Sequence, residues 1–282
     1  MKKQILLATL SLSTFIASAQ EVMKIEKNDG TSVEYDISNI KKFYFTEKST
    51  DEHNKKLVSI EVTEVEAEDK EYDHDLWILK YDSKGRLISY GVNDEITSVT
   101  YDQNVIYCAG GEIEKNTHYL LDDGTISHST IENYYGSSDY WKFFYNSNGQ
   151  LERLTFEETM YGHFDYQSYT WSGNKMVEGF YTESGMEGTW NRLFNYGGLT
   201  CNGFNPAIVI FGLEDDFEDF MPIIAKPELA GFKTNELPSS FEEDGDIMNI
   251  TYDLYEDGYL KSCKGVWDFS PNSWVEYRFT WE

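Results

Sequence analysis

The feature that most constrains the fold is a short unit that recurs along the chain. Tyr-Asp-Ser-Lys-Gly-Arg-Leu occupies residues 81–87, Tyr-Asn-Ser-Asn-Gly-Gln-Leu occupies residues 145–151, and a shortened copy, Tyr-Glu-Asp-Gly-Tyr-Leu, occupies residues 255–260. In each copy a strand ends at an aromatic residue, polar residues that can bond the local backbone follow, and a Gly that accepts positive φ precedes an apolar residue that begins the next strand. The unit therefore predicts repeated β-hairpins. Looser copies lie at residues 119–126 and 27–33.

The segments between these hairpins read as strands. Tyr, Phe and Trp make up 16% of the residues, which suits half-buried pleated surfaces better than helices. Near the C-terminus an apolar residue alternates with a polar one, at Val275, Tyr277, Phe279 and Trp281. This alternation predicts a strand with one buried face and one face exposed to solvent. Hairpins without long crossovers predict an all-β fold, an up-and-down antiparallel meander forming a strongly curved, barrel-like sheet. A closed barrel and an open curved sheet are both compatible with this pattern.

One segment departs from the strand pattern. Residues 206–231 hold apolar side chains at helical spacing, among them Phe217, Phe220 and Ile224, beside an acidic group at 214–219. The segment predicts one or two short helices that lie across an end or the mouth of the sheet, with Gly231 as their stop.

The N-terminus has the pattern of a secretory signal peptide. Residues 1–19 contain two lysines, then a mostly apolar stretch, then small residues at 17–19. The apolar stretch is shorter than the roughly 20 residues that span a bilayer as a helix, and no later segment predicts a transmembrane helix. We therefore expect an exported protein, periplasmic or extracellular, that begins near Gln20. Because the first cysteine is Cys108, the sequence does not predict a lipoprotein.

Composition divides the remaining chain into three parts. Residues 20–46 contain three short strand patterns and predict a small N-terminal β module. Residues 47–56 are charged or polar throughout and predict a linker. Residues 57–282 predict the curved antiparallel domain.

The charge excludes one class of partner. The chain has 50 acidic and 23 basic residues and a net charge of −27, which becomes −27 − 2 = −29 once Lys2 and Lys3 are removed with the signal peptide. Nucleic-acid binding depends on clustered Lys and Arg, so nucleic acid is not an expected partner. The same field repels anionic membrane surfaces. A small molecule or a glycan, neutral or cationic, and divalent cations remain open as ligands.

The cysteines carry no recognisable site. Cys108, Cys201 and Cys263 lie far apart without a Cys-x-x-Cys motif, which excludes a zinc signature and a disulfide framework. We expect three small buried side chains; the alternative is one disulfide and one free thiol.

Residues 57–282 resemble a family of exported domains of unknown function from Bacteroidetes with a porin-like fold. The resemblance rests on the hairpin units at 81–87 and 145–151, the Leu-x-x-Gly-x-Ile piece at 121–126, Tyr169-Thr170-Trp171, and the motifs from Leu237 to Tyr259. Residues 23–45 resemble a short strand module common at the front of exported proteins of that group. Many relatives have a lipobox cysteine, which this chain lacks. The resemblance implies a fold and a location, and it implies no activity.

Catalytic motifs are absent from the sequence. There is no Gly-x-Ser-x-Gly nucleophile motif and no His-Glu-x-x-His zinc motif. Asp73-His74-Asp75 is the tightest cluster of metal-ligand types, but neighbouring residues of a strand point to opposite faces and cannot share one ion. We predict no catalytic residue and no metal site.

Paired carboxylates leave an enzymatic alternative. Glycosidases need only two carboxylates at a set separation, and Glu157-Glu158, Asp215-Asp216 and Glu242-Glu243-Asp244 are adjacent acids that are more typical of charged loop rims. The run from Glu242 to Asp246 has oxygen ligands that could suit calcium, although it lacks the Asp-x-Asp-x-Asp-Gly spacing. We predict no cofactor, with calcium as the weaker alternative.

Aromatic residues are the main indication of a ligand site. Such rings could line a concave sheet and stack on sugars or hold an apolar ligand, and the alternative is ordinary core packing. The candidates are Trp141, Tyr169, Trp171, Trp190, Trp267 and Trp274, with Tyr140 and Tyr166 nearby in the pattern. We predict non-catalytic binding of a glycan or another neutral or apolar ligand at the cell envelope. The alternatives are a two-carboxylate glycoside-active enzyme and a purely structural or protein-interaction role.

A membrane barrel is a further alternative. Membrane strands need apolar residues on their lipid-facing side. Residues 151–158 carry Arg153 and Glu157 on one face and Glu152 and Glu158 on the other. This strand argues against lipid contact on either face.

Overall fold

The computed structural model describes residues 22–26, 32–36, 55–66, 71–93, 95–110, 113–132, 138–158, 163–183, 188–213 and 220–282. The predicted signal peptide, most of the predicted linker, the turn at 28–30, the third strand of the N-terminal module and the acidic group at 214–219 lie outside the described residues. The chain divides into two units, Met1–Asp51 and Glu52–Glu282. In the first unit β1 (Val22–Glu26) and β2 (Ser32–Asp36) pair as an antiparallel hairpin.

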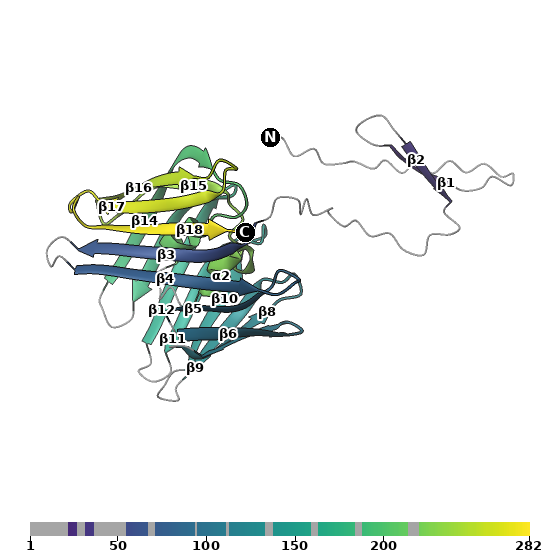
Figure 1. Ribbon diagram of the computed structural model, residues 1–282, viewed down its shortest axis with the longest axis horizontal. Coiled ribbons are helices and arrows are strands. Elements are labelled where there is room, and N and C mark those ends of the chain that lie inside the picture. Colours follow the sequence, from purple (N-terminus) through teal and green to yellow (C-terminus); the bar gives the residue numbers. More distant parts are fainter. Residues whose placement is uncertain are drawn as a thin grey trace. The chain divides into compact units, whose positions relative to one another are not determined.

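The second unit is a closed antiparallel barrel of 16 strands (Figure 1). Each strand pairs with the next one in the sequence, and β18 pairs with β3 to complete the ring. The strands are β3 (Leu57–Glu66), β4 (Glu71–Tyr81), β5 (Leu87–Val92), β6 (Glu95–Asp102), β7 (Val105–Gly110), β8 (Ile113–Leu120), β9 (Ile126–Glu132), β10 (Ser138–Tyr145), β11 (Leu151–Glu158), β12 (His163–Ser172), β13 (Lys175–Glu183), β14 (Gly188–Thr200), β15 (Glu236–Glu243), β16 (Asp246–Leu254), β17 (Leu260–Trp267) and β18 (Trp274–Trp281). The predicted antiparallel meander is confirmed, and the sheet closes, which leaves no exposed edge.

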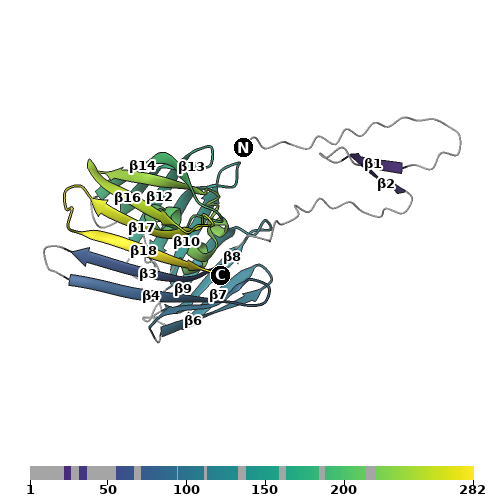
Figure 2. The same cartoon turned by 45° about the horizontal axis from the view of Figure 1, so that its top comes forward.

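The two ends of the barrel differ. Because the strands run antiparallel in sequence order, all connections that follow even-numbered strands lie at one end, which we call the turn end. The same end holds both termini of the barrel, where Lys56 and Glu282 exchange backbone hydrogen bonds of 2.6 and 2.9 Å. The opposite end is the loop end. Figure 2 shows β3 and β18 side by side from a second direction.

The recurring sequence unit forms the tight hairpins of the turn end. Asp82 and Asn146 each accept two backbone N–H bonds within their own turn, at 2.9 and 2.9 Å for Asp82 and at 2.9 and 3.2 Å for Asn146. Gly85 and Gly149 lie three residues after that Asp or Asn and have φ of +79° and +70°. This region of backbone conformation disfavours residues that carry a Cβ. The hairpins predicted at these positions are therefore confirmed.

The aromatic residue of the unit has a second structural role. On six of the even-numbered strands an inward Tyr or Trp near the turn end donates a hydrogen bond to a backbone carbonyl at the start of the neighbouring strand. These bonds run from Tyr81 to Leu57, Tyr145 to Ile126, Trp171 to Leu151, Tyr196 to Met176, Tyr252 to Pro238, and Trp281 to Leu260, at 2.6–2.8 Å. Each of the six acceptor residues lies beside a register shift between its own strand and the neighbouring strand on the side away from the donor. The bonds satisfy carbonyls that such bulges leave free.

A helical insertion between β14 and β15 fills the inside of the barrel near the turn end. It consists of α1 (Pro206–Gly212), α2 (Met221–Ala225) and the 3-10 helix η2 (Pro227–Ala230), which ends at Gly231 with φ of +75°. We call these three helices the plug. Their side chains contact rings from several strands, with Phe220 against Trp141 and Phe211 against Tyr277. The predicted helices and their stop at Gly231 are confirmed.

Burial defines the direction in which each strand position faces. Strand positions on the same face as the residues that contact the plug point inward. On β3 and β18 these inward side chains are buried near the turn end. Toward the loop end the inward side chains become half-buried or exposed, for example Val62 and Glu64 on β3, Asp139 on β10, and Tyr277 and Val275 on β18. Solvent therefore reaches the inner wall from the loop end, while the plug covers it at the turn end.

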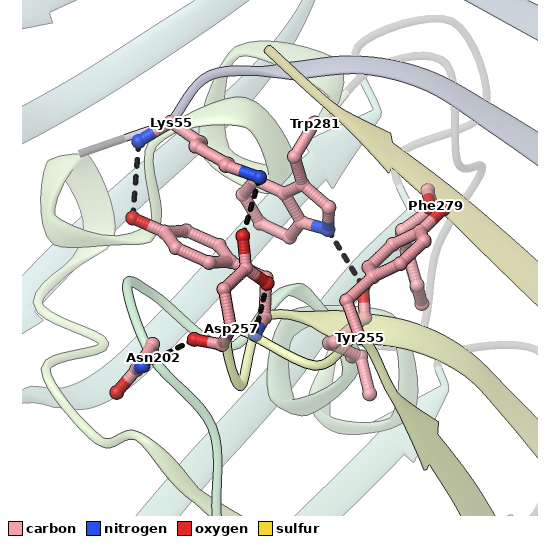
Figure 3. A network of polar contacts seen from close by, with 8 residues as sticks. Lys55, Asn202, Tyr255, Asp257, Phe279 and Trp281 are labelled. Atoms are coloured by element: carbon pink, nitrogen blue, oxygen red, sulfur yellow. Dashed lines mark hydrogen bonds and ion pairs between the residues drawn. The ribbon is translucent and has the colours of Figure 1, made fainter. Parts of the chain in front are cut away.

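A polar network fixes the first described residues of the second unit to the turn end (Figure 3). The side chain of Lys55 forms an ion pair with Asp257, and its backbone N–H donates to the Tyr259 hydroxyl at 3.0 Å. The Asn202 amide donates to the Asp257 carbonyl at 2.6 Å. The hydrogen bond from Lys55 lowers the pKa of the Asp257 carboxyl below its usual range.

The three cysteines are buried and unbonded. Cys108, Cys201 and Cys263 are free thiols, and burial raises the pKa of Cys201 to about 11. They have the environment of small core residues, as expected.

Candidate functional site

The inner wall at the loop end carries a group of aromatic side chains, which we call the aromatic arc: Tyr181, Trp190, Phe241 and Trp267. Trp190 and Tyr181 are stacked with ring centroids 5.8 Å apart and planes 16° apart, and Trp267 meets Phe241 edge-on at 5.4 Å. Tyr181 and Phe241 are buried, whereas Trp190 and Trp267 are half-buried and keep part of their surface open to solvent. Trp267 also contacts Phe269, which is 64% exposed.

Arg192 joins the two halves of the aromatic arc. Its guanidinium lies 5.2 Å from the Tyr181 ring centroid and 4.7 Å from that of Phe241. It donates to Glu243 from Nε at 2.8 Å and from Nη2 at 2.6 Å, and from Nη1 to the Phe211 carbonyl of the plug at 2.8 Å. The Tyr181 hydroxyl donates to the Gly212 carbonyl at 2.8 Å. These bonds fix the rings relative to the C-terminal end of α1.

A second group on the inner wall is acidic. Asp139, Glu158 and Asp165, which we call the acidic arc, occupy neighbouring inward positions on β10, β11 and β12. Asp139 is paired directly with Glu158 across the strands, and Asp165 is paired with Phe156, two residues from Glu158. All three are half-buried. The inward Gln167 lies between this arc and Tyr181 in strand register, so the two arcs are continuous.

Three of the candidate aromatics support the barrel rather than line an open surface. Trp141 is 3% exposed and packs on Phe156 and Phe220. Tyr169 is buried and donates its hydroxyl hydrogen to the Gln167 side chain. Trp171 belongs to the repeated aromatic bonds of the turn end and meets Phe232. Their positions match the core-packing alternative.

The other candidates separate by face. Trp190 and Trp267 lie on the inner wall within the aromatic arc. Trp274 lies on the outer face, where the Lys264 ammonium sits 3.5 Å from its ring centroid, so it does not line the concave side. Tyr140 and Tyr166 also face outward, because each is one residue out of phase with an inward position.

The adjacent acidic pairs do not combine in the structure. Glu157 faces outward and Glu158 inward, and Glu242 faces outward while Glu243 faces inward to Arg192. Asp215-Asp216 lies outside the described residues. The run from Glu242 to Asp246 forms a two-residue hairpin in which Asp244 and Gly245 have φ of +52° and +94°, as a type I′ turn requires. Within the described ranges no three His, Cys, Asp or Glu side chains are grouped so as to hold a metal ion.

Sequence reasoning missed the polar members of the site. Arg192, Asp139 and Asp165 are isolated charged residues in aromatic strands, and none belongs to a motif. The available signal was the phase of β14, where Trp190, Phe194 and Tyr196 alternate and Arg192 falls on the same face. A charged residue at an inward position indicates a partner inside the barrel, which is Glu243.

Two solved structures of porin-like proteins are similar in fold to this closed antiparallel β-barrel. A porin-like protein from Bacteroides uniformis ATCC 8492 aligns with a TM-score of 0.64 and 18% identity, over 80% of this chain and 98% of that one. A porin-like protein from Bacteroides vulgatus ATCC 8482 aligns with a TM-score of 0.60 and 13% identity, over 79% of this chain and 97% of that one. At these identities the likeness establishes the fold.

No protein-family model and no curated protein matches the sequence. Among the described residues, none of the helices has the length and hydrophobicity needed to cross a membrane.

Proposed function

We propose that this protein is exported to the cell envelope and binds, without catalysis, a glycan or another ligand with an apolar face inside the loop end of its barrel. The observation that carries the proposal is the aromatic arc, in which Trp190 and Trp267 face inward and remain partly open to solvent. These half-exposed rings pack on Tyr181 and Phe241, which contact the Arg192 guanidinium, and they offer flat surfaces on which sugar rings or apolar groups can stack. The likeness to porin-like proteins of Bacteroides supports a location at the envelope.

A thermal-shift screen tests the proposal. The chain from Gln20 is heated with oligosaccharides, bile acids, fatty acids and calcium, because a ligand that binds only the folded state raises the melting temperature. Any class that gives a shift is then measured by calorimetry with Trp190→Ala and Trp267→Ala. We expect each variant to lose about tenfold in affinity, which corresponds to about 1.4 kcal/mol.

Trp274→Ala is the matched control. This tryptophan is also half-buried and lies on the outer face of the same barrel. Its replacement should leave affinity unchanged. If no ligand class raises the melting temperature, or if all three variants weaken binding equally, a structural or protein-contact role replaces the proposed one.

One observation favours the enzymatic alternative. Asp139 and Glu158 face each other on the inner wall beside aromatic rings, and glycosidases place two carboxylates around the bond that they cleave. Incubating any glycan that binds with wild-type protein and with Asp139→Asn distinguishes the two functions. Products formed by the wild type and lost in the variant would establish an enzyme, and an intact glycan supports binding alone.

The outer face supports an aqueous rather than a lipid environment. Three charged residues face outward on β3 and β18: Glu61, Glu276 and Arg278. Arg278 Nη2 donates to Glu276 Oε2 at 3.0 Å, and Arg278 Nη1 lies 3.9 Å from Glu61 Oε2. Lipid-facing strands of membrane barrels carry apolar residues at such positions. A ligand would therefore enter from water at the loop end.

A further inference from the structure

The aromatic arc, Arg192 and Phe269 form one continuous run of contacts with two open ends. In order along the run the groups are Trp190, Tyr181, Arg192, Phe241, Trp267 and Phe269, with neighbours 4.7–5.8 Å apart. Tyr181 and Phe241 in the middle are 1% and 2% exposed, whereas Trp190 and Trp267 are half-buried and Phe269 is 64% exposed. The run therefore offers a ligand two separate ring surfaces, which we call the platforms: Trp190 is one, and Trp267 with Phe269 is the other.

Strand register sets the separation of the platforms. Residues paired in a row across β14 to β17 are Phe194, Phe241, Met248 and Trp267, and Trp190 lies four residues before Phe194 on β14. Three strand spacings and four residues correspond to about 14 Å across the sheet and about 14 Å along it. A single sugar ring contacts one platform at a time, and only an extended ligand reaches both.

A glycine allows the first platform to be fixed against the plug. A Cβ at the inward Gly179 would lie 2.3 Å from the Tyr181 hydroxyl oxygen and 2.7 Å from the ring carbon that bears it. Tyr181 therefore lies over bare backbone, and its hydroxyl reaches the Gly212 carbonyl at 2.8 Å. Trp190 stacks on this fixed ring. Rings that are held in place before a ligand arrives lower the entropic cost of binding.

An ion pair lies between the two platforms. Arg192 and Glu243 are paired across β14 and β15, and the bonds from Arg192 Nε and Nη2 both end on Glu243 Oε2. Oε1 can therefore accept a hydrogen bond from a ligand that passes over the pair. The Glu243 side chain is 22% exposed, and an alkyl chain across it would remove a charge from water without supplying a hydrogen bond. A chain of sugar rings supplies hydroxyls at this point and flat apolar faces at the platforms.

We propose that the ligand is a linear oligosaccharide that spans both platforms and donates a hydroxyl hydrogen bond to Glu243 Oε1. This inference rests on the proposed function, because it names the class and the length of the ligand of the same inner wall. A monosaccharide is too short for this site, and a fatty acid lacks the hydroxyl that the ion pair requires.

A chain-length series tests the inference. Calorimetry with the chain from Gln20 measures the disaccharides to hexasaccharides of β-1,4-linked glucose, xylose and mannose and of α-1,4-linked glucose. In a series that binds, we expect the hexasaccharide to bind about tenfold more tightly than the disaccharide, because the second platform is engaged at a high effective concentration. Trp190→Ala and Trp267→Ala should each reduce the hexasaccharide to the affinity of the disaccharide, whereas Trp274→Ala on the outer face should keep the length dependence.

Two variants on β15 test the polar contact. Glu243→Gln should weaken the hexasaccharide several-fold and leave the disaccharide unchanged, because only the longer chain crosses the ion pair. Glu242→Gln is the matched control, since this neighbouring carboxylate is exposed on the outer face, and it should keep wild-type affinity. An equal loss for both chain lengths in Glu243→Gln would indicate a general disturbance of the aromatic arc and would contradict the hydroxyl contact.

The outcomes distinguish this inference from the proposed function. Affinity that is independent of chain length, or a length dependence that persists in both inner tryptophan variants, overturns the inference. If no oligosaccharide binds but a fatty acid or a bile acid binds in a manner that depends on Trp190 or Trp267, the inference fails and the proposed function stands. If no ligand of any class binds, both fail. Melting curves establish that each variant is folded before its affinity is used.

Discussion

His118 is the buried group that links single-residue chemistry to the stability of the barrel. It is 1% exposed, its Nδ1 lies 2.7 Å from the Ser129 hydroxyl, and burial lowers its pKa to about 4. The folded protein therefore binds fewer protons than the unfolded chain below the ordinary pKa near 6.5. Protonation of this imidazole therefore does not affect the free energy of unfolding above that pH. As the pH falls from there to about 4, the free energy of unfolding decreases by about 3 kcal/mol.

The corresponding prediction is that the free energy of unfolding depends less on pH in His118→Asn than in wild type. Urea unfolding at several pH values between the two pKa values should show a smaller loss of free energy on acidification than in wild type, because the variant has no imidazole to protonate. Identical slopes for His118→Asn and wild type would show that this imidazole is not buried in its neutral form.

The inward tyrosines of the turn end make a second prediction at the residue scale. Tyr252 donates to the Pro238 carbonyl at 2.6 Å, and burial raises its pKa above the usual range. Tyr252→Phe leaves a buried carbonyl without its donor and should lower the free energy of unfolding by about 1–3 kcal/mol. Tyr107→Phe on the outer face should change it by less than about 0.5 kcal/mol. Denaturant titration of both variants decides whether the repeated bonds stabilise the barrel.

At the scale of elements, the plug depends on one glycine. Gly231 ends η2 with φ of +75°, and a Cβ added there would lie 2.6 Å from the Gly149 carbonyl oxygen and 2.9 Å from the Leu151 nitrogen. Both are backbone atoms of the hairpin between β10 and β11, so they cannot move away easily. The close approach packs the end of the plug against the recurring turn unit.

Gly231→Ala should therefore destabilise the barrel much more than a glycine change without this contact. We expect a loss of about 2–4 kcal/mol, from backbone strain and overpacking together. Gly124→Ala is the control, because Gly124 also has positive φ, at +87°, but a Cβ there meets nothing within 4 Å; it should lose about 1 kcal/mol. Equal losses in thermal melts would mean that the plug end adapts to the added methyl group.

At the scale of the whole molecule, the barrel contains everything needed for its own closure. The ring is completed by pairing of β18 with β3, and Lys55 and Lys56 are bonded to residues of the same unit. Its core consists of inward strand residues and plug residues from within Glu52–Glu282.

A chain that begins at Glu52 should consequently fold as the full chain does. Calorimetry should show a single cooperative barrel transition with a melting temperature within about 2 °C of that of the chain from Gln20. A large drop in melting temperature would reveal that the first unit stabilises the barrel.

Parts of the fold and of the site were predictable to different degrees. The hairpins at Gly85 and Gly149, the alternation of β18 and the helices that stop at Gly231 depend on local chemistry, and all were predicted correctly. Of the aromatic candidates, the inner wall holds Trp190 and Trp267 partly exposed, whereas Trp274 faces outward. One-residue differences in phase decide this, and no motif in the sequence indicates which phase faces the lumen.

The antiparallel meander, the positions of its turns and the helical interruption can be read from local sequence, because turn residues, alternation and helical spacing act between residues that are near each other in the chain. Closure of the sheet, and the packing of the plug inside one end of it, became visible in the folded barrel alone. Folding also brought Arg192 to Glu243 and Asp139 opposite Glu158. These features depend on strand register and on pairing between β3 and β18 from the two ends of the domain, and such long-range contacts are not encoded in any local pattern.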